Sequence, residues 1–435
     1  MMLFYHCQLP MLKYRASTLG IHHAKYAHPD NTVTIYLHFS YAIKAHNHTF
    51  APKIELMKQH SIVALFLLLA ACGPADEGKK EEATHEAHGH SHGSEPAHEV
   101  DTNTLVYSDE KHLKNVIQLT TGGDNAEAYF GFDSKTVVFQ RTNPAEGIEC
   151  DQIFYGVLPQ TGEDKFEYKM VSTGTGRTTC SYMMPDGKHV MYSSTHLAGK
   201  ECPPVPDKEK MKKYVWPVYD TYDIFIGDLD GKVVKQLTNT PGYDAEPTIS
   251  PKGDKVVFTS TRNGDLDLYV MNLDGSNVKQ ITKELGYDGG AWFSPDGSQI
   301  VWRASRPKTA EEQKEYKDLL AQGLVMPTNM EVFVANADGS DVKQITNLGK
   351  ANWAPNWMPD GKRIIFASNH EYERGFPFNM YIINMDGTGL EKISHDGGFD
   401  AFPMFSPDGK RILFSSNRNN KGTRETNMFI ADWVD

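Results

Sequence analysis

Short apolar runs separated by polar turns dominate the chain from about residue 102 onward. Segments such as Arg363–Phe366 and Arg411–Phe414 each hold three apolar residues and follow a Pro-Asp-Gly turn. Runs of this length, bounded by proline and glycine, are typical of β-strands joined by tight turns. The pattern therefore predicts an all-β domain over residues 102–435.

The strands recur in a fixed unit. Each copy reads Leu-Thr or Ile-Thr, an apolar strand, Ser-Pro-Asp-Gly or a variant, a second strand, Ser-x-Arg or Ser-x-His, a third strand and Asp-Gly. Successive turn prolines are 66, 44, 64 and 48 residues apart, which fits one four-stranded propeller blade per unit, with insertions in two copies. With a degenerate first copy at Phe132–Lys135, six copies predict a six-bladed β-propeller of antiparallel blades. The turn prolines are Pro185, Pro251, Pro295, Pro359 and Pro407.

The two ends of the repeat region predict how the ring closes. The last copy stops after its third strand, Asn427–Ala431, whereas Lys114–Thr120 has the pattern of a fourth strand with no blade before it. We therefore expect this N-terminal strand to complete the last blade.

Several copies carry the turn, cation and Leu-Thr positions together, as at Ser294–Gly297 and Ser406–Gly409. At these residues the chain resembles the TolB-type, WD40-like propeller repeat, and the resemblance covers residues 110–435. Similar repeats occur in TolB-like envelope lipoproteins and in prolyl-oligopeptidase-like peptidases. We expect neither the α/β domain of TolB nor the hydrolase domain of the peptidases, because neither pattern is present in the sequence. The resemblance implies a propeller with a role in envelope integrity or transport.

Residues 57–71 have the pattern of a lipoprotein signal peptide, with Lys58 before the apolar run Ile62–Ala71. Leu69–Cys72 is similar to a lipobox, which implies cleavage before Cys72 and a diacylglycerol on its thiol. An ordinary signal peptide, or a buried helix with a chance cysteine, is the alternative. Because a secretory signal acts from the N-terminus, we interpret residues 1–56 as a mis-called extension. We expect the lipid to be the sole membrane attachment, to the outer membrane, with the protein facing the periplasm or the cell surface.

Residues 72–101 are rich in Glu, Lys, His, Gly and Ser and hold almost nothing apolar. Such a segment cannot bury enough surface to fold, so we predict a disordered His/Glu-rich tether. Its histidines could chelate a divalent metal, although a solvated spacer is the favoured interpretation. The whole chain carries a net charge of −12, which argues against nucleic acid as a partner. We expect a monomer.

In an antiparallel blade, the turns between strands two and three lie at the opposite end from the Ser-Pro-Asp-Gly turns. We call this end the top face. Two long insertions, at residues 196–222 and 306–330, begin there, and the second opens with the capping box Thr309–Glu312 and a helical stretch to Gly323. Irregular loops on a rigid scaffold commonly carry binding sites, so the top face is the predicted binding surface.

Charged and polar side chains are expected to surround the channel mouth on this face. They could bind a peptide end, a glycan or a metal; alternatively, each cation pairs with a neighbouring carboxylate and only holds the blades in register. The candidates at the turns between strands two and three are Arg141, His196, Arg262, Arg306, His370 and Arg418. The candidates at the entry to the innermost strands are Glu127, Arg177, Asp244, Glu246, Asp288, Asn352 and Asp400.

Cys7 lies in the predicted extension, so once Cys72 carries lipid three cysteines remain for an oxidising compartment. We predict a disulfide between Cys180 and Cys202, because both belong to the second blade. Pairing of Cys202 with Cys150, in the loops of adjacent blades, stays open.

The sequence holds no phosphate-binding loop, zinc-protease motif, dinucleotide fingerprint or Ser-His-Asp order. We therefore predict a non-enzymatic protein without a cofactor that binds an envelope protein or a cell-wall component. One alternative is a metal-dependent propeller lyase or hydrolase acting on carbohydrate, with His196 and His370 as ligands, although four convergent ligand positions would be needed. The other alternative is a structural scaffold lipoprotein.

Overall fold

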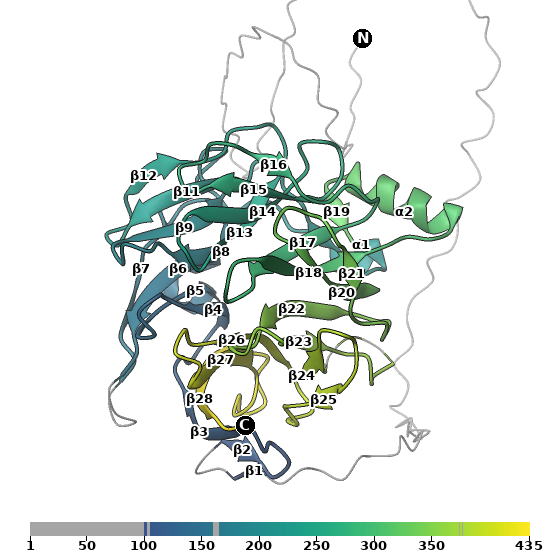
Figure 1. The fold of residues 1–435 in the computed structure, drawn as a ribbon. Helices are drawn as coiled ribbons and strands as arrows, with labels where there is room; N and C mark the ends of the chain where they lie inside the picture. The colour runs from purple at the N-terminus through teal and green to yellow at the C-terminus, as the bar shows by residue number, and fades with distance from the viewer. Residues whose placement is uncertain (1–99, 102–104, 160–164, 374, 376) are drawn as a thin grey trace, which may run out of the picture. The chain divides into compact units, whose positions relative to one another are not determined.

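The computed structural model describes residues 100–101, 105–159, 165–373, 375 and 377–435, which all belong to one folded unit (Figure 1). The predicted extension at 1–56, the signal peptide at 57–71, Cys72 and nearly all of the tether at 72–101 lie outside the described residues. Among the described residues, no helix is long and apolar enough to cross a membrane.

The described residues form six four-stranded antiparallel sheets, as predicted, and they follow one another in chain order around a common centre (Figure 1). Each innermost strand lies against the innermost strand of the next blade, and the last lies against the first. Blade 1 consists of β4 (Asp124–Phe130), β5 (Thr136–Asn143), β6 (Ile148–Val157) and β7 (Tyr168–Met170). Blade 2 consists of β8 (Thr178–Met183), β9 (His189–Ser194), β11 (Asp223–Asp228) and β12 (Val233–Gln236).

The remaining four blades repeat this order from the inside outward. Blade 3 consists of β13 (Asp244–Ile249), β14 (Lys255–Ser260), β15 (Asp267–Asn272) and β16 (Lys279–Gln280). Blade 4 consists of β17 (Asp288–Phe293), β18 (Gln299–Ser305), β20 (Met330–Asn336) and β21 (Lys343–Gln344). Blade 5 consists of β22 (Asn352–Trp357), β23 (Arg363–Ser368), β24 (Asn379–Asn384) and β25 (Glu391–Lys392). Blade 6 consists of β26 (Asp400–Phe405), β27 (Arg411–Ser416), β28 (Asn427–Trp433) and β3 (Leu113–Gln118).

The predicted closure by an N-terminal strand is confirmed. β3 pairs antiparallel with β28, with Ile117 opposite Ile430 and Leu113 opposite Trp433. Nearby, the imidazole of His112 stacks on the Trp433 ring with centroids 4.9 Å apart. Before β3, the short strands β1 (Val100–Asp101) and β2 (Val106–Tyr107) pair with each other.

Apolar side chains of the second strands form much of the core between the sheets. Val256, Val257 and Phe258 of β14 are fully buried, as are Ile364, Ile365 and Phe366 of β23. Side chains on both faces of these strands are buried because each sheet packs between two neighbours, so the runs are apolar throughout and do not alternate with polar residues.

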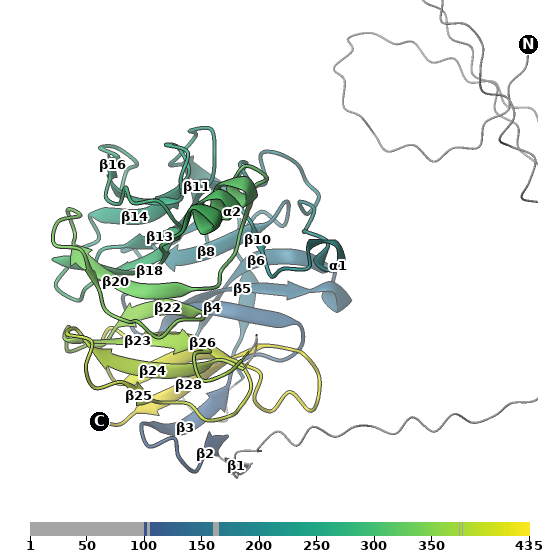
Figure 2. The ribbon, with the colours of Figure 1, turned by 90° about the vertical axis from the view of Figure 1, so that its right-hand side faces the viewer.

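The two insertions meet each other at the top face, although about 100 residues separate them. The first contains α1 (Lys208–Met211) and β10 (Trp216–Pro217), and the second contains α2 (Ala310–Leu320) and β19 (Leu324–Val325). β10 pairs antiparallel with β19, and the Val218 amide donates to the Gly323 carbonyl at 2.7 Å. We call residues 216–218 and 323–325 the roof; α2 and β10 lie close together in Figure 2.

The predicted capping box of α2 is confirmed. The Thr309 hydroxyl accepts from the Glu312 amide, and the Glu312 carboxylate accepts from the Thr309 amide. The helix ends at Leu320, before the predicted limit at Gly323, because the amides of Gln322 and Gly323 form tighter turn hydrogen bonds to Leu319 and Leu320. Gly323 has φ +70°, a left-handed conformation that glycine adopts without steric strain.

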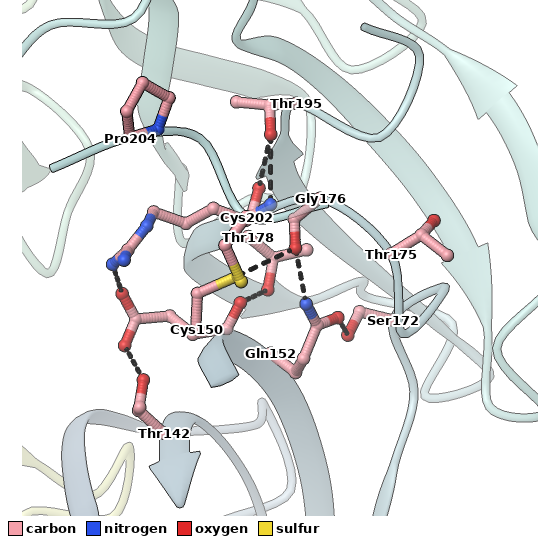
Figure 3. Close-up of a disulfide and its surroundings, with 12 residues drawn as sticks. Thr142, Cys150, Gln152, Ser172, Thr175, Gly176, Thr178, Thr195, Cys202 and Pro204 are labelled. Carbon is pink, nitrogen blue, oxygen red and sulfur yellow. Dashed lines mark hydrogen bonds and ion pairs between the residues drawn. A yellow bond between two sulfur atoms is a disulfide. The ribbon is translucent and has the colours of Figure 1, made fainter. Parts of the chain in front are cut away.

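The predicted Cys180–Cys202 disulfide is wrong, because Cys202 bonds to Cys150 (Figure 3). Cys150 lies on β6 of blade 1, and Cys202 lies in the insertion of blade 2 that runs over the end of that strand. Cys180 instead lies within β8 and is free. The bridge therefore ties the first insertion to the neighbouring blade. A prediction that pairs cysteines of the same blade could not give this contact between blades.

Candidate functional site

Every innermost strand carries a β-bulge near its top-face end. In β13, for example, the strand register shifts between Ala245 and Thr248, and Glu246 takes a positive φ of 58°. A bulge inserts an extra residue and redirects its side chain. The corresponding residues of the six blades, all with positive φ, are Glu127, Cys180, Glu246, Gly290, Ala354 and Phe402. All six line one cavity at the centre of the ring.

This cavity has a volume of about 370 Å³ and lies between the bulge residues and the roof. Trp216, Pro217 and Val218 line it from the first insertion, and Val325 lines it from the second. Tyr129 and Trp292 also line it, with their rings 4.8 Å apart and nearly edge to face. A volume of this size falls in the range of small-molecule sites.

One ion pair in the cavity wall has its carboxylate fully bonded. Glu246 accepts hydrogen bonds from the Tyr287 hydroxyl at 2.9 Å, the Thr259 hydroxyl at 2.7 Å and the Gly290 amide at 3.0 Å, and it pairs with Arg303. The Arg303 guanidinium lies over the rings of Trp216 and Tyr287, 5.6 and 5.3 Å from their centroids. The charges of Glu246 and Arg303 therefore neutralise each other.

A second ion pair joins Arg177, which precedes β8, to Asp151 of β6. Asp151 also accepts a hydrogen bond from the Thr142 hydroxyl. Both charged side chains are only 22% exposed, so the pair is partly shielded from water. Within the described residues, the Nε of Arg177 has no hydrogen-bond partner.

Glu127 differs from both pairs because, among the described residues, no cation forms an ion pair with it. Burial raises the pKa of its carboxyl to about 7; the nearby Glu246 charge adds to the rise, while a hydrogen bond from Cys180 opposes it. The Cys180 thiol lies 3.2 Å from the Thr179 hydroxyl, and burial together with Glu127 raises the pKa of this thiol well above its usual value. Near neutral pH the Glu127 carboxyl is therefore close to half ionised, and Cys180 is a neutral thiol.

Three of the predicted cations act within their own blades instead of facing the cavity. Arg262 pairs with Asp244 at 2.8 Å, Arg306 with Asp288 at 2.6 Å and Arg418 with Asp400 at 3.2 Å. Each guanidinium also lies 4.9 Å from the centroid of an aromatic ring of the same blade: Tyr269, Phe333 and Phe414, respectively. We call these three pairs the clamps. Their geometry matches the alternative in which the cations hold the blades in register.

The two predicted histidines occupy the same position in blades 2 and 5. His196 lies 2.9 Å from the Ser194 hydroxyl, and His370 lies 3.0 Å from the Ser368 hydroxyl, which in turn donates to Asn352 at 2.7 Å. Burial lowers the pKa of both imidazoles. Because two blades lie between them on either side of the ring, they do not converge. In the part of the chain that the structure describes, no three His, Cys, Asp or Glu side chains form a group that could hold a metal ion.

Arg141 does not occupy the position predicted for it. It lies opposite Asn125 in the strand register, as Ser260 lies opposite Asp244 in blade 3, so it is two residues short of the Arg262 position. Its guanidinium bonds to Asn125 at 2.6 Å and to Glu146 at 2.8 Å. The equivalence fails because blade 1 lacks the Ser-x-Arg turn.

Of the predicted site residues, only Glu127, Arg177 and Glu246 line the cavity. The sequence interpretation did not identify Asp151, Arg303, Trp216 and Trp353 as site residues, and it assigned Cys180 to a disulfide. One signal in the sequence could have located the bulge residues. In blades 3 to 6 the bulge residue stands two residues after a predicted entry position, as Glu246 follows Asp244 and Phe402 follows Asp400.

A family model described as the TolB beta propeller domain matches residues 203–312 and 320–424. A curated protein, dipeptidyl-peptidase 5 of Porphyromonas gingivalis, is 56% identical over 39 residues. That stretch covers 9% of this chain and 6% of the length of the peptidase.

Among solved structures, an Agrobacterium tumefaciens protein assigned as TolB is 18% identical with a TM-score of 0.47, over 74% of this chain and 97% of that one. TolB from Acinetobacter baumannii is 20% identical with a TM-score of 0.44, over 69% and 64%. An oligogalacturonate lyase in complex with manganese is 15% identical with a TM-score of 0.42, over 78% and 96%.

Proposed function

Since this chain carries a β-propeller of the TolB family, we propose that it is a non-enzymatic binding protein of the bacterial cell envelope. Lipid on Cys72 anchors it to the outer membrane, and the roofed end of the propeller binds a partner protein or a cell-wall component. The roof and the cavity beneath it are the recognition site.

The observation that carries this proposal is the meeting of two insertions at one end of the ring. They come from blades 2 and 4, yet they pair strand to strand through β10 and β19 and enclose the cavity. The Ser-Pro-Asp-Gly turns at the opposite end, such as those at Pro251 and Pro295, are short. Loops that depart from a repeat on one face of a rigid scaffold are where propellers and similar folds place recognition.

The chemistry of the cavity favours binding over catalysis. Glu246 already accepts hydrogen bonds from four groups, which leaves it no free capacity to accept a proton from a substrate. The Cys180 thiol, with its raised pKa, is a poor nucleophile because only the thiolate attacks readily.

The test is photo-crosslinking in intact cells, with a photoreactive amino acid at Val205 in the first insertion. The matched control carries it at Val342, an exposed valine in the turn between β20 and β21 at the opposite end; the two are 64% and 48% exposed. We expect a specific adduct from position 205 and none from position 342. Adducts from position 342 alone would overturn the proposal.

The carbohydrate-active alternative has its own test. We expect the purified protein to bind less than stoichiometric Mn, Ca or Zn and to leave oligosaccharides uncleaved. Stoichiometric metal together with cleavage would replace the binding function with an enzymatic one.

A further inference from the structure

We infer that the cavity selects a ligand that carries a cationic amine on an aromatic or apolar body, and that its ammonium group pairs with Glu127. This inference rests on the proposed function, because it names the ligand class of the roofed cavity.

The first argument is the charge balance of the wall. Three carboxyl groups, Glu127, Asp151 and Glu246, line the cavity together with two guanidinium groups, Arg177 and Arg303. Both guanidiniums are already paired, Arg177 with Asp151 and Arg303 with Glu246. The acid left over is Glu127. A bound anion would compete with Asp151 or Glu246 for these guanidinium groups, whereas among the described residues no cation pairs with Glu127.

The second argument is the aromatic content of the wall. Trp216, Trp353, Tyr222, Tyr243 and Tyr287 all line the cavity, and the Trp216 and Trp353 rings are 4.9 Å apart. Ring faces attract cations, and the wall already holds one, since the Arg303 guanidinium lies over Trp216 and Tyr287. The same rings provide apolar surface for the body of the ligand.

The third argument is the position of Glu127. It stands at a bulge residue with φ +51°, a strained conformation for a residue other than glycine, and the bulge redirects its side chain to the cavity. The groups that act on its carboxyl are Cys180, Glu246, Arg303 and Asp151, and it in turn acts on Tyr129. Burial and the carboxylates of Glu246 and Asp151 disfavour its ionisation, whereas Cys180 and Arg303 favour it. A bound ammonium group would offset the repulsion from the two carboxylates.

This arrangement predicts how affinity changes with pH. Because the Glu127 pKa is about 7, the carboxyl is largely protonated at pH 5 and largely ionised at pH 8. An amine of ordinary basicity stays cationic over this range. Its affinity should therefore rise by up to about tenfold per pH unit below pH 7 and level off above it.

The experiment titrates the full-length lipid-free chain with benzylamine, with neutral benzyl alcohol and with anionic benzoate, by calorimetry and by tryptophan fluorescence. Trp216, Trp292 and Trp353 all line the cavity and report on its occupancy. The variant is Glu127→Gln, which keeps the size of the side chain. The matched control is Glu167→Gln, on the outer side of the same blade, where the native carboxylate is 78% exposed.

We expect benzylamine to bind about tenfold or more tightly than benzyl alcohol. Glu127→Gln should abolish this difference, and Glu167→Gln should preserve it. The inference is overturned if benzoate binds more tightly than benzylamine, if Glu127→Gln leaves benzylamine affinity unchanged, or if benzylamine does not bind at about 10 mM. An adduct at position 205 that persists in any of these cases would leave the proposed function standing, so the two failures are distinguishable.

Discussion

The clamps and the cavity wall both hold charged side chains from the innermost strands, but they use the repeat in opposite ways. At the clamp position the same chemistry recurs, with a cation of the second-to-third turn beside the first residue of the innermost strand in blades 3, 4 and 6. At the bulge position two residues later, the six blades carry two Glu and one each of Cys, Gly, Ala and Phe.

This difference separates a structural requirement that all blades share from a requirement that differs from blade to blade. Every blade must hold its top-face end in place, so an ion pair that stabilises one blade can stabilise another. A ligand contacts each blade differently, so the residues around it diverge. Recurrent charge in this propeller therefore identifies blade stabilisation, and divergence at an equivalent position identifies the candidate site.

The largest expected effect comes from breaking a clamp. Arg418 is 1% exposed, and it bonds to Asp400 and to Glu110, both fully buried. Arg418→Ala leaves these carboxylates without a cation and should lower the free energy of unfolding by about 3–5 kcal/mol. Urea denaturation would measure the loss. The control Arg363→Ala removes a partly exposed pair with Asp360 and should cost no more than about 1 kcal/mol.

The next effect concerns the attachment of the first insertion. The Cys150–Cys202 disulfide closes a loop with a sequence separation of 52. The double variant Cys150→Ser, Cys202→Ser should lower stability by about 2–4 kcal/mol, because the unfolded chain gains freedom. Thermal melts with and without reductant would check this. Reductant should lower the melting temperature of the native chain and leave that of the double variant unchanged.

A smaller, pH-dependent effect is expected in the cavity. The folded state raises the pKa of Glu127 from 4.5 to about 7. This destabilises the fold increasingly as the pH rises from 4.5 to about 7 and by a constant amount above that, whereas below pH 4.5 the carboxyl is neutral in both states. Glu127→Gln should therefore stabilise the protein by about 1–2 kcal/mol at pH 8 and by little at pH 5. Denaturant titrations at both pH values measure the difference. An equal effect at pH 5 and pH 8 would show that burial does not raise the pKa of Glu127.

The smallest effect concerns the conformation of the bulge. Ala354 has φ +47°, which costs energy for any residue with a Cβ. Ala354→Gly removes this strain but also frees the unfolded chain, so we expect a net stabilisation of about 0.5 kcal/mol. Chemical denaturation resolves a change of this size with repeated measurement. A loss of stability would mean that the Ala354 methyl group packs usefully in the wall.

Much of the fold follows from local sequence. Pro-Asp-Gly turns, apolar runs such as Arg363–Phe366 and the missing fourth strand after Asn427–Ala431 predict six blades and their closure, because each feature depends on nearby residues. The capping box at Thr309 could be predicted for the same reason. The Cys150–Cys202 bridge could not be predicted from local sequence, since it depends on where the first insertion crosses the neighbouring blade.

The sequence by itself determined the repeat, the number of blades and the strand that closes the ring, since turn chemistry and hydrophobic pattern act over a few residues. Only the tertiary structure decided which charged groups face the cavity. Asp244 and Glu246 stand two residues apart, on the same side of a regular strand, yet a bulge sends one to a clamp and the other to the wall. Likewise, only folding brought Trp216 and Val325 together as a roof, because no local pattern specifies a contact between insertions from different blades.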